Sequence, residues 1–337
     1  MIFGITMGDA SGVGPEIILK AFRAGEIRHP VAVFGDWEAL ACCNQLLGYR
    51  VALRRAGSPR DRQEGFLNVI DAGMLSGEDL KIGVVNAASG AAARAYVVAA
   101  AKAALGGEIA AMVTLPMNKE ATQLSDPSFV GHTELIGEVC GVTDVTIMLV
   151  SEQLIVTHVS THCSLREAIA RVKQDRIAKI LELTCEAVGK LRPGPRIAVA
   201  GLNPHAGENG LFGREEIEEI RPAVEWAKSR GLPVDGPFPP DTLFYLAVQK
   251  KRYDAVVCMY HDQGHVPLKL LDFEGGVNVA LGLPIIRTSV DHGTAFDIAY
   301  KGVASTRSLI CALELAARLA GSRAGDDPEE PIRPKQS

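Results

Sequence analysis

Short apolar runs alternate with longer helical patterns along almost the whole chain, and this alternation limits the possible folds more than any other feature. The predicted strands are residues 3–7, 31–34, 68–70, 110–114, 145–150, 154–159, 197–201, 254–259 and 277–281. The predicted helices are residues 15–24, 89–105, 165–191, 214–229, 241–249, 294–300 and 306–319. Strands that alternate with helices in this way are typical of α/β proteins with a largely parallel sheet. We therefore expect an α/β fold.

Length and charge exclude several classes of protein. A chain of 337 residues is long enough for about two domains. Its 35 Lys and Arg against 40 Asp and Glu give a net charge of −5, which argues against a broad nucleic-acid-binding face. The most apolar long stretch, residues 91–117, is interrupted by Arg94, Lys102 and Glu108, so no membrane span is expected.

The seven cysteines indicate a reducing compartment. Their number is odd, their spacing is scattered, and no C-x-x-C motif occurs. This pattern favours reduced thiols over a disulfide framework. Residues 1–6 show no basic region followed by an apolar core, so no signal peptide is expected. Together these features predict a cytoplasmic protein.

Histidines concentrate at the ends of predicted strands. His162, His205 and His261 follow the strands at 154–159, 197–201 and 254–259. Ligands of open α/β sheets bind outside the carboxyl ends of strands, and three neutral imidazoles with one open position make a catalytic zinc site. The separations form no compact motif, so the alternative is three separate loop histidines that bond to the backbone. His158 lies within an apolar run and is expected to be a core residue.

Two glycine-rich segments each have two interpretations. The segment 7–16 leads from a strand into a helix and is either an anion-binding loop or a tight, closely packed turn. The segment 207–213 precedes the helical pattern from Arg214 and either approaches a nucleotide or merely connects two elements. Neither contains G-x-G-x-x-G, so composition alone does not identify NAD.

Several other polar residues have a functional and an ordinary interpretation. Lys269 and Arg287 suit a phosphoryl group, although most single basic residues are simply surface charge. Thr133, in the segment 131–134, offers a hydroxyl group or caps a helix. Asp241 is either a helix cap or a general base.

These segments, taken in order, resemble the 4-hydroxythreonine-4-phosphate dehydrogenase (PdxA) family. The most specific features are His205 within N-P-H-A-G-E-N-G and His261 within Y-H-D-Q-G. The matching blocks reach from the N-terminus to about residue 320 and are residues 8–16, 131–134, 161–162, 201–213, 236–242, 260–264, 276–283 and 287–295.

The resemblance implies a fold like that of isocitrate and isopropylmalate dehydrogenases, with two α/β domains and a cleft between them. Residues 1–130 and 282–325 would form the first, discontinuous domain. Residues 131–281 would form the second, with the metal ligands and the dimer contacts, and residues 326–337 would be a flexible tail. The family resemblance also implies a homodimer whose active site lies at the subunit interface.

The resemblance also implies roles for individual residues. A divalent ion (zinc, cobalt, manganese, nickel or magnesium) would be held by His162, His205 and His261. The phosphorylated substrate would be held by His132, Thr133, Lys269, Asn278 and Arg287. NAD or NADP would contact Gly207, Glu208, Asn209 and Asp291. The candidates for proton transfer are Lys119 and Asp241.

The implied reaction is a metal- and NAD-dependent oxidation of the 3-hydroxyl of a 4-phosphorylated hydroxy acid, followed by loss of CO2. His265-Val266 after Gly264 favours the branch of the family that converts 4-phospho-D-threonate or 4-phospho-D-erythronate to dihydroxyacetone phosphate. The alternative substrate is the 4-hydroxythreonine 4-phosphate of pyridoxal phosphate (vitamin B6) biosynthesis. Two further hypotheses are a non-redox metal-dependent lyase or hydrolase, and a sugar-phosphate-binding module in which the histidines do not meet.

Overall fold

A single mixed sheet of 12 strands runs through the computed structural model, which describes residues 1–321. Its strand order is β3-β4-β2-β1-β5-β12-β11-β6-β7-β10-β8-β9. The strands are β1 (Phe3–Thr6), β2 (Val31–Gly35), β3 (Leu53–Arg55), β4 (Leu67–Asp71), β5 (Ala111–Thr114), β6 (Thr146–Val150), β7 (Ile155–His158), β8 (Ile197–Ala200), β9 (Val234–Phe238), β10 (Ala255–Cys258), β11 (Val277–Leu281) and β12 (Arg287–Val290).

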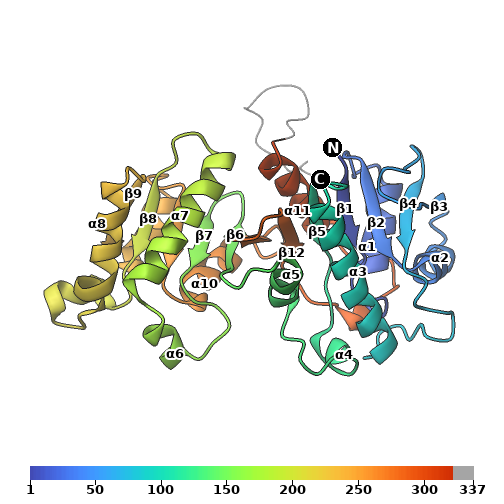
Figure 1. The fold of residues 1–337 in the computed structure, drawn as a ribbon, viewed down its shortest axis with the longest axis horizontal. Coiled ribbons are helices and arrows are strands. Elements are labelled where there is room, and N and C mark those ends of the chain that lie inside the picture. The colour runs from blue at the N-terminus through green and yellow to red at the C-terminus, as the bar shows by residue number, and fades with distance from the viewer. Residues whose placement is uncertain (322–337) are drawn as a thin grey trace.

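Helices cover both faces of this sheet (Figure 1). They are α1 (Gly14–Arg23), α2 (Trp37–Leu46), α3 (Ala87–Leu105), α4 (Lys119–Gln123), α5 (His132–Cys140), α6 (Leu165–Ala170), α7 (Gln174–Leu191), α8 (Arg221–Ser229), α9 (Pro240–Val248), α10 (His261–Leu271) and α11 (Arg307–Leu319). Three irregular segments add to these: η1 (Pro204–Gly210), the π-helical η2 (Glu216–Ile220) and η3 (Phe296–Ile298). The expected α/β class is confirmed.

The twist of the sheet decides where the strand ends lie. β11 is antiparallel to β12 and β6, and β6 is antiparallel to β7. When strand direction is followed from neighbour to neighbour across the sheet, the mutually parallel strands β7, β10 and β8 are therefore antiparallel to β1 and β5. Six steps separate β1 from β10, and at about 20–25° per step the sheet turns by about 120–150°.

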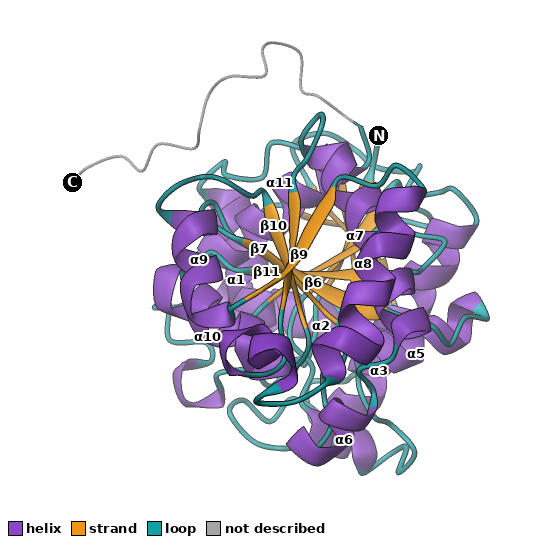
Figure 2. Ribbon diagram, turned by 90° about the vertical axis from the view of Figure 1, so that its left-hand side faces the viewer, coloured by secondary structure: helices purple, strands orange, loops and turns teal. Residues whose placement is uncertain are grey.

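This turn largely offsets the reversed strand direction, so the carboxyl ends of both halves face the same side. Figure 2 shows the strands fanning out when the molecule is viewed along its long axis. In Figure 1, α4, which follows β5, and α6, which follows β7, both lie at the lower side of the molecule. Loops from the two halves can therefore build one site there.

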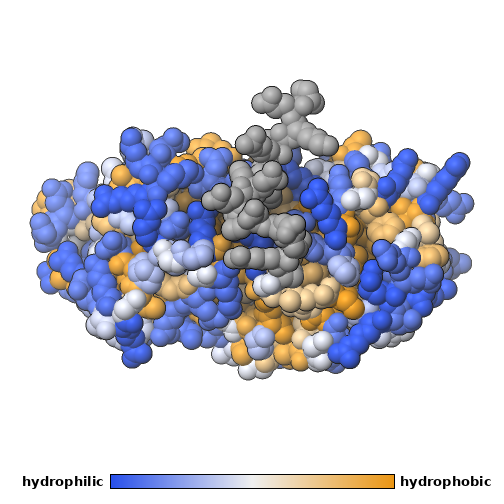
Figure 3. Space-filling model, turned by 90° about the horizontal axis from the view of Figure 1, so that it is seen from above, coloured by the Kyte–Doolittle hydropathy of each residue, from blue (hydrophilic) through white to orange (hydrophobic). Residues whose placement is uncertain are grey.

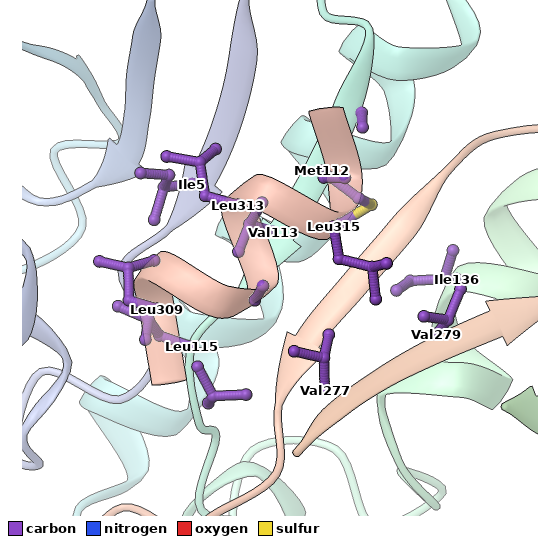
Figure 4. Packing of buried hydrophobic residues seen from close by; sticks show 14 of the residues in the cluster. Ile5, Met112, Val113, Leu115, Ile136, Val277, Val279, Leu309, Leu313 and Leu315 are labelled. Atoms are coloured by element: carbon purple, nitrogen blue, oxygen red, sulfur yellow. The ribbon is translucent and has the colours of Figure 1, made fainter. Parts of the chain in front are cut away.

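The core is made by apolar side chains that the sheet buries on both faces. Figure 4 shows Leu309, Leu313 and Leu315 of α11 beside Ile5 and Val113 of the central strands. A fully buried leucine contributes about 1.5–3 kcal/mol. A second cluster joins β7, β8 and β10 to α9 and α10 in the other half. Both halves thus have packed interiors that hold the strand ends in place.

All the predicted strands are present, but β3, β9 and β12 were missed. β12 has the sequence Arg-Thr-Ser-Val and is fully buried, so its polarity hid it from an analysis based on apolar runs. β9 contains Pro237, which weakens the strand signal.

The helix predictions were less accurate. The predicted helix 165–191 is interrupted between Ala170 and Gln174, and the helix predicted at 294–300 is only the three-residue turn η3. Helices α2, α4 and α10 were not predicted, whereas α5 begins close to the helix that Thr133 was expected to cap. The segment after β10 was expected to be a loop, yet α10 begins at His261 itself, with Asp262 favouring the positive end of the helix dipole.

Other expectations about the whole chain have mixed outcomes. All seven cysteines are free, as the sequence predicted. In the described part of the chain, no helix is both long and apolar enough to cross a bilayer. The boundaries at residues 130 and 282 stay predictions, because one sheet continues across them. The predicted tail 326–337, and residues 322–325 of the first domain, lie outside the described residues.

Hydrophobic residues gather near the middle of the long axis on the face shown in Figure 3. A groove of about 770 Å³ is lined by residues of α7, the loop after β11, and α11, including Leu183, Leu283, Ile285 and Leu319. None of the predicted site residues lines this groove.

Candidate active site

Two of the three predicted metal ligands lie together. β7 and β10 are neighbouring parallel strands, so the loop after β7 and the start of α10 emerge side by side. The ring centroids of His162 and His261 are 5.7 Å apart. Asp262 Oδ1 lies 2.7 Å from His261 Nδ1, and a carboxylate there accepts the Nδ1 proton. This bond leaves the Nε2 lone pair of His261 free to bind a metal ion.

The surroundings of His162 favour its neutral, metal-binding form. Burial lowers the pKa of His162, and the charges of His261 and Lys119 lower it further, whereas Glu134 raises it. Lys119 begins α4 and Glu134 lies in the first turn of α5, so both come from segments that follow β5 rather than β7. Charged groups from the other half of the molecule therefore reach this site.

His205 does not join the other two imidazoles. It is exposed on η1, after β8, and its ring centroid is 6.1 Å from that of Phe212. Within residues 1–321, no three His, Cys, Asp or Glu side chains are gathered in the arrangement of a metal site. Imidazole donors fit zinc, cobalt or nickel in their chemistry. The three-histidine set therefore stays a prediction, with two members adjacent and the third on a neighbouring loop.

The loop that carries His205 has an unusual backbone. Five consecutive residues, 205–209, have positive φ, and four of them are not glycine. Such residues cost about 1–2 kcal/mol each. The compensation comes from the buried carboxylate of Glu216, which accepts hydrogen bonds from the backbone N–H groups of Leu202 and Asn203, both at 2.7 Å, and from Asn203 Nδ2 at 3.0 Å. Strain of this kind is typical of functional loops.

Glu216 also explains Gly207, which was predicted to contact the cofactor. A Cβ atom on Gly207 would lie 2.6 Å from Glu216 Oε2, so glycine is required for packing. Glu208 and Asn209, the other predicted cofactor residues in this loop, are exposed. Sequence reasoning missed Glu216, because nothing local distinguishes it from its neighbour Glu215.

A row of buried imidazoles extends inward from His261. The rings of His261 and His265 are stacked, with centroids 3.5 Å apart. His265 Nδ1 lies 3.0 Å from the carbonyl oxygen of His261 and 3.2 Å from His158 Nε2, so its proton is shared between these two acceptors. His158 is a buried core residue, as predicted, and its Nδ1 faces the carbonyl oxygen of Ile147 at 3.4 Å.

This row makes stability depend on pH. Burial, followed by the charge of His265, lowers the pKa of His158 to about 3, and burial followed by His261 lowers that of His265 to about 4. The unfolded chain binds these protons below about pH 6.5, so the free energy of unfolding falls as the pH drops from 7.5 to 5.5. Each histidine contributes about 1 kcal/mol to this fall.

The test is urea unfolding at both pH values. In His158→Gln, whose side chain does not titrate, the fall should be about 1 kcal/mol smaller than in the wild type. Equal falls in the two proteins would contradict a neutral, buried His158.

Arg287 is a buried cation without an acidic partner. Its side chain lies at the start of β12 and is 3% exposed. Nη2 and Nε donate to Thr114 Oγ1 at 2.7 and 3.1 Å, and Nη1 faces Asn278 Oδ1 at 3.4 Å. Among the ion pairs of residues 1–321, none includes Arg287. Burial lowers its pKa to about 10, so it stays charged at neutral pH.

His132 lies close to this guanidinium. Burial and, to a smaller extent, the charge of Arg287 lower the pKa of His132 to about 3. Its Nε2 is buried and has no hydrogen-bond partner. His132 is also the first residue of α5, whose N-terminus favours anions. The charge of Glu134 acts on Arg287 but forms no ion pair with it. A buried guanidinium without an ion pair, an unpartnered imidazole nitrogen and a helix N-terminus together suit a phosphoryl group.

The remaining predicted substrate residues fit this site to different degrees. Asn278, on β11, contacts Arg287 directly. Thr133 lies one residue further into α5; Gly131 is the N-cap, so the alternative that Thr133 caps the helix was wrong. Lys269 forms an ion pair of 2.9 Å with Asp291. Asp291 was predicted to contact the cofactor. In this structure it is paired with Lys269 instead.

The two candidates for proton transfer have different surroundings. Lys119 begins α4 and its charge acts on His162. Asp241 is exposed in the first turn of α9, where its Oδ1 accepts a hydrogen bond from the N–H of Thr242. Pro239 is the N-cap of α9, so the alternative that Asp241 caps this helix was wrong.

The glycine-rich segment 7–16 is closely packed. All of its residues are buried. A Cβ atom on Gly14 would lie 2.0 Å from the carbonyl oxygen of Met7, which leaves no room for a side chain. Burial raises the pKa of Asp9, whose Oδ2 has no hydrogen-bond partner. The geometry of the segment supports the tight-turn interpretation.

Comparison with known families gives a match over most of the chain. Residues 26–316 match the family model described as pyridoxal phosphate biosynthetic protein PdxA. The D-threonate 4-phosphate dehydrogenase of Cupriavidus necator is 45% identical over 96% of this chain and 98% of its own length. The 4-hydroxythreonine-4-phosphate dehydrogenase of Desulforapulum autotrophicum is 44% identical over 94% of each chain.

The fold is also shared with a solved structure. The crystal structure of 4-hydroxythreonine-4-phosphate dehydrogenase from Klebsiella pneumoniae superimposes with a TM-score of 0.86 and 44% sequence identity. The match covers 95% of this chain and 99% of that one. Both sequence and architecture therefore agree over nearly the whole length.

Proposed function

The chain belongs to the PdxA family, and from this premise we propose that it is a dehydrogenase that oxidises the 3-hydroxyl of a 4-phosphorylated hydroxy acid. The observation that carries the proposal is the buried, unpaired guanidinium of Arg287 beside the unpartnered Nε2 of His132. A buried cation is costly unless an anion approaches it. A dianionic phosphate ester would supply that anion.

The substrate class that we propose is 4-phospho-D-threonate or 4-phospho-D-erythronate, with dihydroxyacetone phosphate and CO2 as products. Two observations support this choice. The C. necator relative is named for a D-threonate phosphate. His265 is part of the His265-Val266 pair that favours this branch of the family. Its ring stacks directly on that of the proposed metal ligand His261, so it would lie close to the reacting end of the substrate.

The residues would divide the work as follows. Arg287, His132 and Asn278 bind the phosphate and so orient carbon 3. Lys119 is the group that we assign to proton movement at the 3-hydroxyl, because its charge reaches His162, whereas Asp241 has no such contact. NAD or NADP would accept the hydride, which is chemistry that the cofactor itself supplies.

We propose that His162, His205 and His261 hold one divalent ion. When bound, the ion would supply Lewis-acid polarisation of the substrate hydroxyl. The neutral form of His162 and the Nδ1–Asp262 bond of His261 support this role, because both leave an imidazole lone pair for a metal.

The substrate class can be tested with a panel of three acids: 4-phospho-D-threonate, 4-phospho-D-erythronate and 4-hydroxythreonine 4-phosphate. With NAD and Co²⁺ present, we expect NADH and dihydroxyacetone phosphate from the first two, and little from the third. Removing the metal with a chelator should stop the reaction, and added Co²⁺ should restore it. Product without NADH would support the non-redox lyase instead, and binding without turnover would support the binding module.

We propose a homodimer, and exposed apolar residues of α10 support it. Val266 and Leu270 are 60 and 85% exposed and lie one helical turn apart on α10. Phe273, which follows the end of this helix, is 67% exposed. Contiguous exposed apolar side chains of this kind mark interaction surfaces. The free cysteines support the proposed cytoplasmic location, where thiols stay reduced.

A charge on this surface should separate the dimer. Leu270→Glu is expected to shift the mass from dimer to monomer in light scattering, and to lower kcat/KM if the partner completes the site. Leu46→Glu, at a 60% exposed leucine of α2, is the matched control and should stay dimeric. If Leu270→Glu stayed dimeric, the proposal that α10 lies in the dimer interface would be wrong.

A further inference from the structure

The side chain of Gln263 bridges the ends of two neighbouring strands. Its Oε1 accepts a hydrogen bond from the N–H of Met259 at 2.7 Å, and its Nε2 donates to the carbonyl oxygen of Gly201 at 2.8 Å. Met259 follows β10 and Gly201 follows β8. Gln263 is 7% exposed, so both bonds are shielded from water.

The position of this amide in the sheet is informative. The ladder between β8 and β10 ends with the pair Val257 and Val199. Two residues further along, the same register would place Met259 opposite Gly201. The amide of Gln263 therefore links the two strand ends just beyond the last pair of the ladder, through Met259 N–H and the carbonyl oxygen of Gly201. The strands separate here, yet they stay connected at a defined spacing.

The third histidine loop is tied to the same point. Ser160 Oγ donates a hydrogen bond to the carbonyl oxygen of Met259 at 3.0 Å. Ser160 lies two residues before His162 in the loop that follows β7. Both backbone groups of Met259 are thus occupied, one by Gln263 and one by Ser160. His162, His205 and His261 thus lie on three segments whose starting points are joined at Met259.

We propose that Gln263, together with Ser160, is a positioning residue that fixes the spacing of the three histidine-bearing loops and thereby sets the affinity for a divalent ion. The proposal rests on the proposed function, in which these histidines hold that ion. The amide supplies both the acceptor and the donor that the bridge needs. Groups that orient metal ligands typically change affinity by about 10–100-fold when they are removed.

The test is a titration of the metal-free, full-length protein with Co²⁺, in which binding is monitored through the absorption bands of the bound ion. Gln263→Glu keeps the acceptor for Met259 N–H but loses the donor to Gly201. We expect it to bind Co²⁺ about 10–100-fold more weakly than the wild type, with altered bands. Gln263→Met, which loses both bonds, should weaken binding at least as much.

The matched control is Asn68→Asp, in β4 at the other end of the sheet. Asn68 is 2% exposed; its Oδ1 accepts from the N–H of Gln63, and its Nδ2 donates to backbone carbonyl oxygens of Gln63 and Phe66, each bond at 2.9 Å. The substitution likewise keeps an acceptor and removes a donor. It should lower thermal stability and leave Co²⁺ affinity and bands unchanged.

The outcomes separate this inference from the proposed function. A folded Gln263→Glu with wild-type affinity and bands would overturn the inference and leave the metal site standing. A wild-type protein that binds no Co²⁺ would overturn both. If the Gln263 variants do not fold, the same titration is carried out with Ser160→Ala, which removes one hydrogen bond. Unchanged affinity and bands in this variant would overturn the proposal.

Discussion

Arg287→Met is expected to lower kcat/KM for the phosphorylated substrate by about 10²–10⁴-fold. In the proposed site the guanidinium would donate two hydrogen bonds to the charged phosphate, each worth about 1.5–3 kcal/mol, and the variant would lose both. The thermal midpoint should stay the same or rise, since the variant no longer buries an unpaired charge. A combination of lost activity and retained stability distinguishes a binding residue from a structural one.

The matched control is Arg54→Met. Arg54 is partly buried, and its guanidinium is paired with Asp61 at 2.8 Å at the far edge of the sheet. This variant should lose some stability and keep its kcat/KM. If Arg287→Met kept kcat/KM within a factor of three and instead lost stability, the phosphate assignment would be wrong.

His261→Ala is expected to abolish tight metal binding and to lower kcat by at least about 10³-fold. The reason is that a bound metal ion typically stabilises the charge of the transition state by several kcal/mol. The variant should be purified without stoichiometric metal, as measured by elemental analysis. Added Co²⁺ should restore little activity, because a required ligand is gone.

His29→Ala is the control for this variant. His29 pairs with Glu314 Oε2 at 3.1 Å, away from the histidine loops. It should keep the metal content and the activity of the wild type. Wild-type metal content in His261→Ala would remove His261 from the metal site, even if activity were lost.

The sequence predicted the strands well and the connections poorly, for a physical reason. Strands such as β1 and β10 are buried on both faces, so they appear as continuous apolar runs. β12 is equally buried, but Arg287 and Ser289 occupy one of its faces. Its polarity follows from the site that it supports, and apolar patterning cannot detect such a strand.

The convergence of the histidines depends on strand order, which no local pattern encodes. His162 and His261 are adjacent because β7 and β10 are neighbours in the sheet, although β8 and β9 come between them in the chain. The resemblance to a family supplied their pairing in advance. Gln263 was missed, since its role exists only once β8 and β10 lie side by side. Glu216 was missed because nothing local distinguishes it from Glu215, and its role appears only when it turns back to the loop after β8.

The most direct measurement compares NADH formation by the wild type from 4-phospho-D-threonate and from unphosphorylated D-threonate, with NAD and Co²⁺ present. The account predicts rapid, chelator-sensitive NADH formation from the phosphate ester, and a kcat/KM for the free acid that is lower by at least about 10²-fold, because Arg287 and His132 then have no anion to bind. Equal rates with the two acids, or no NADH from the phosphate ester, would contradict it.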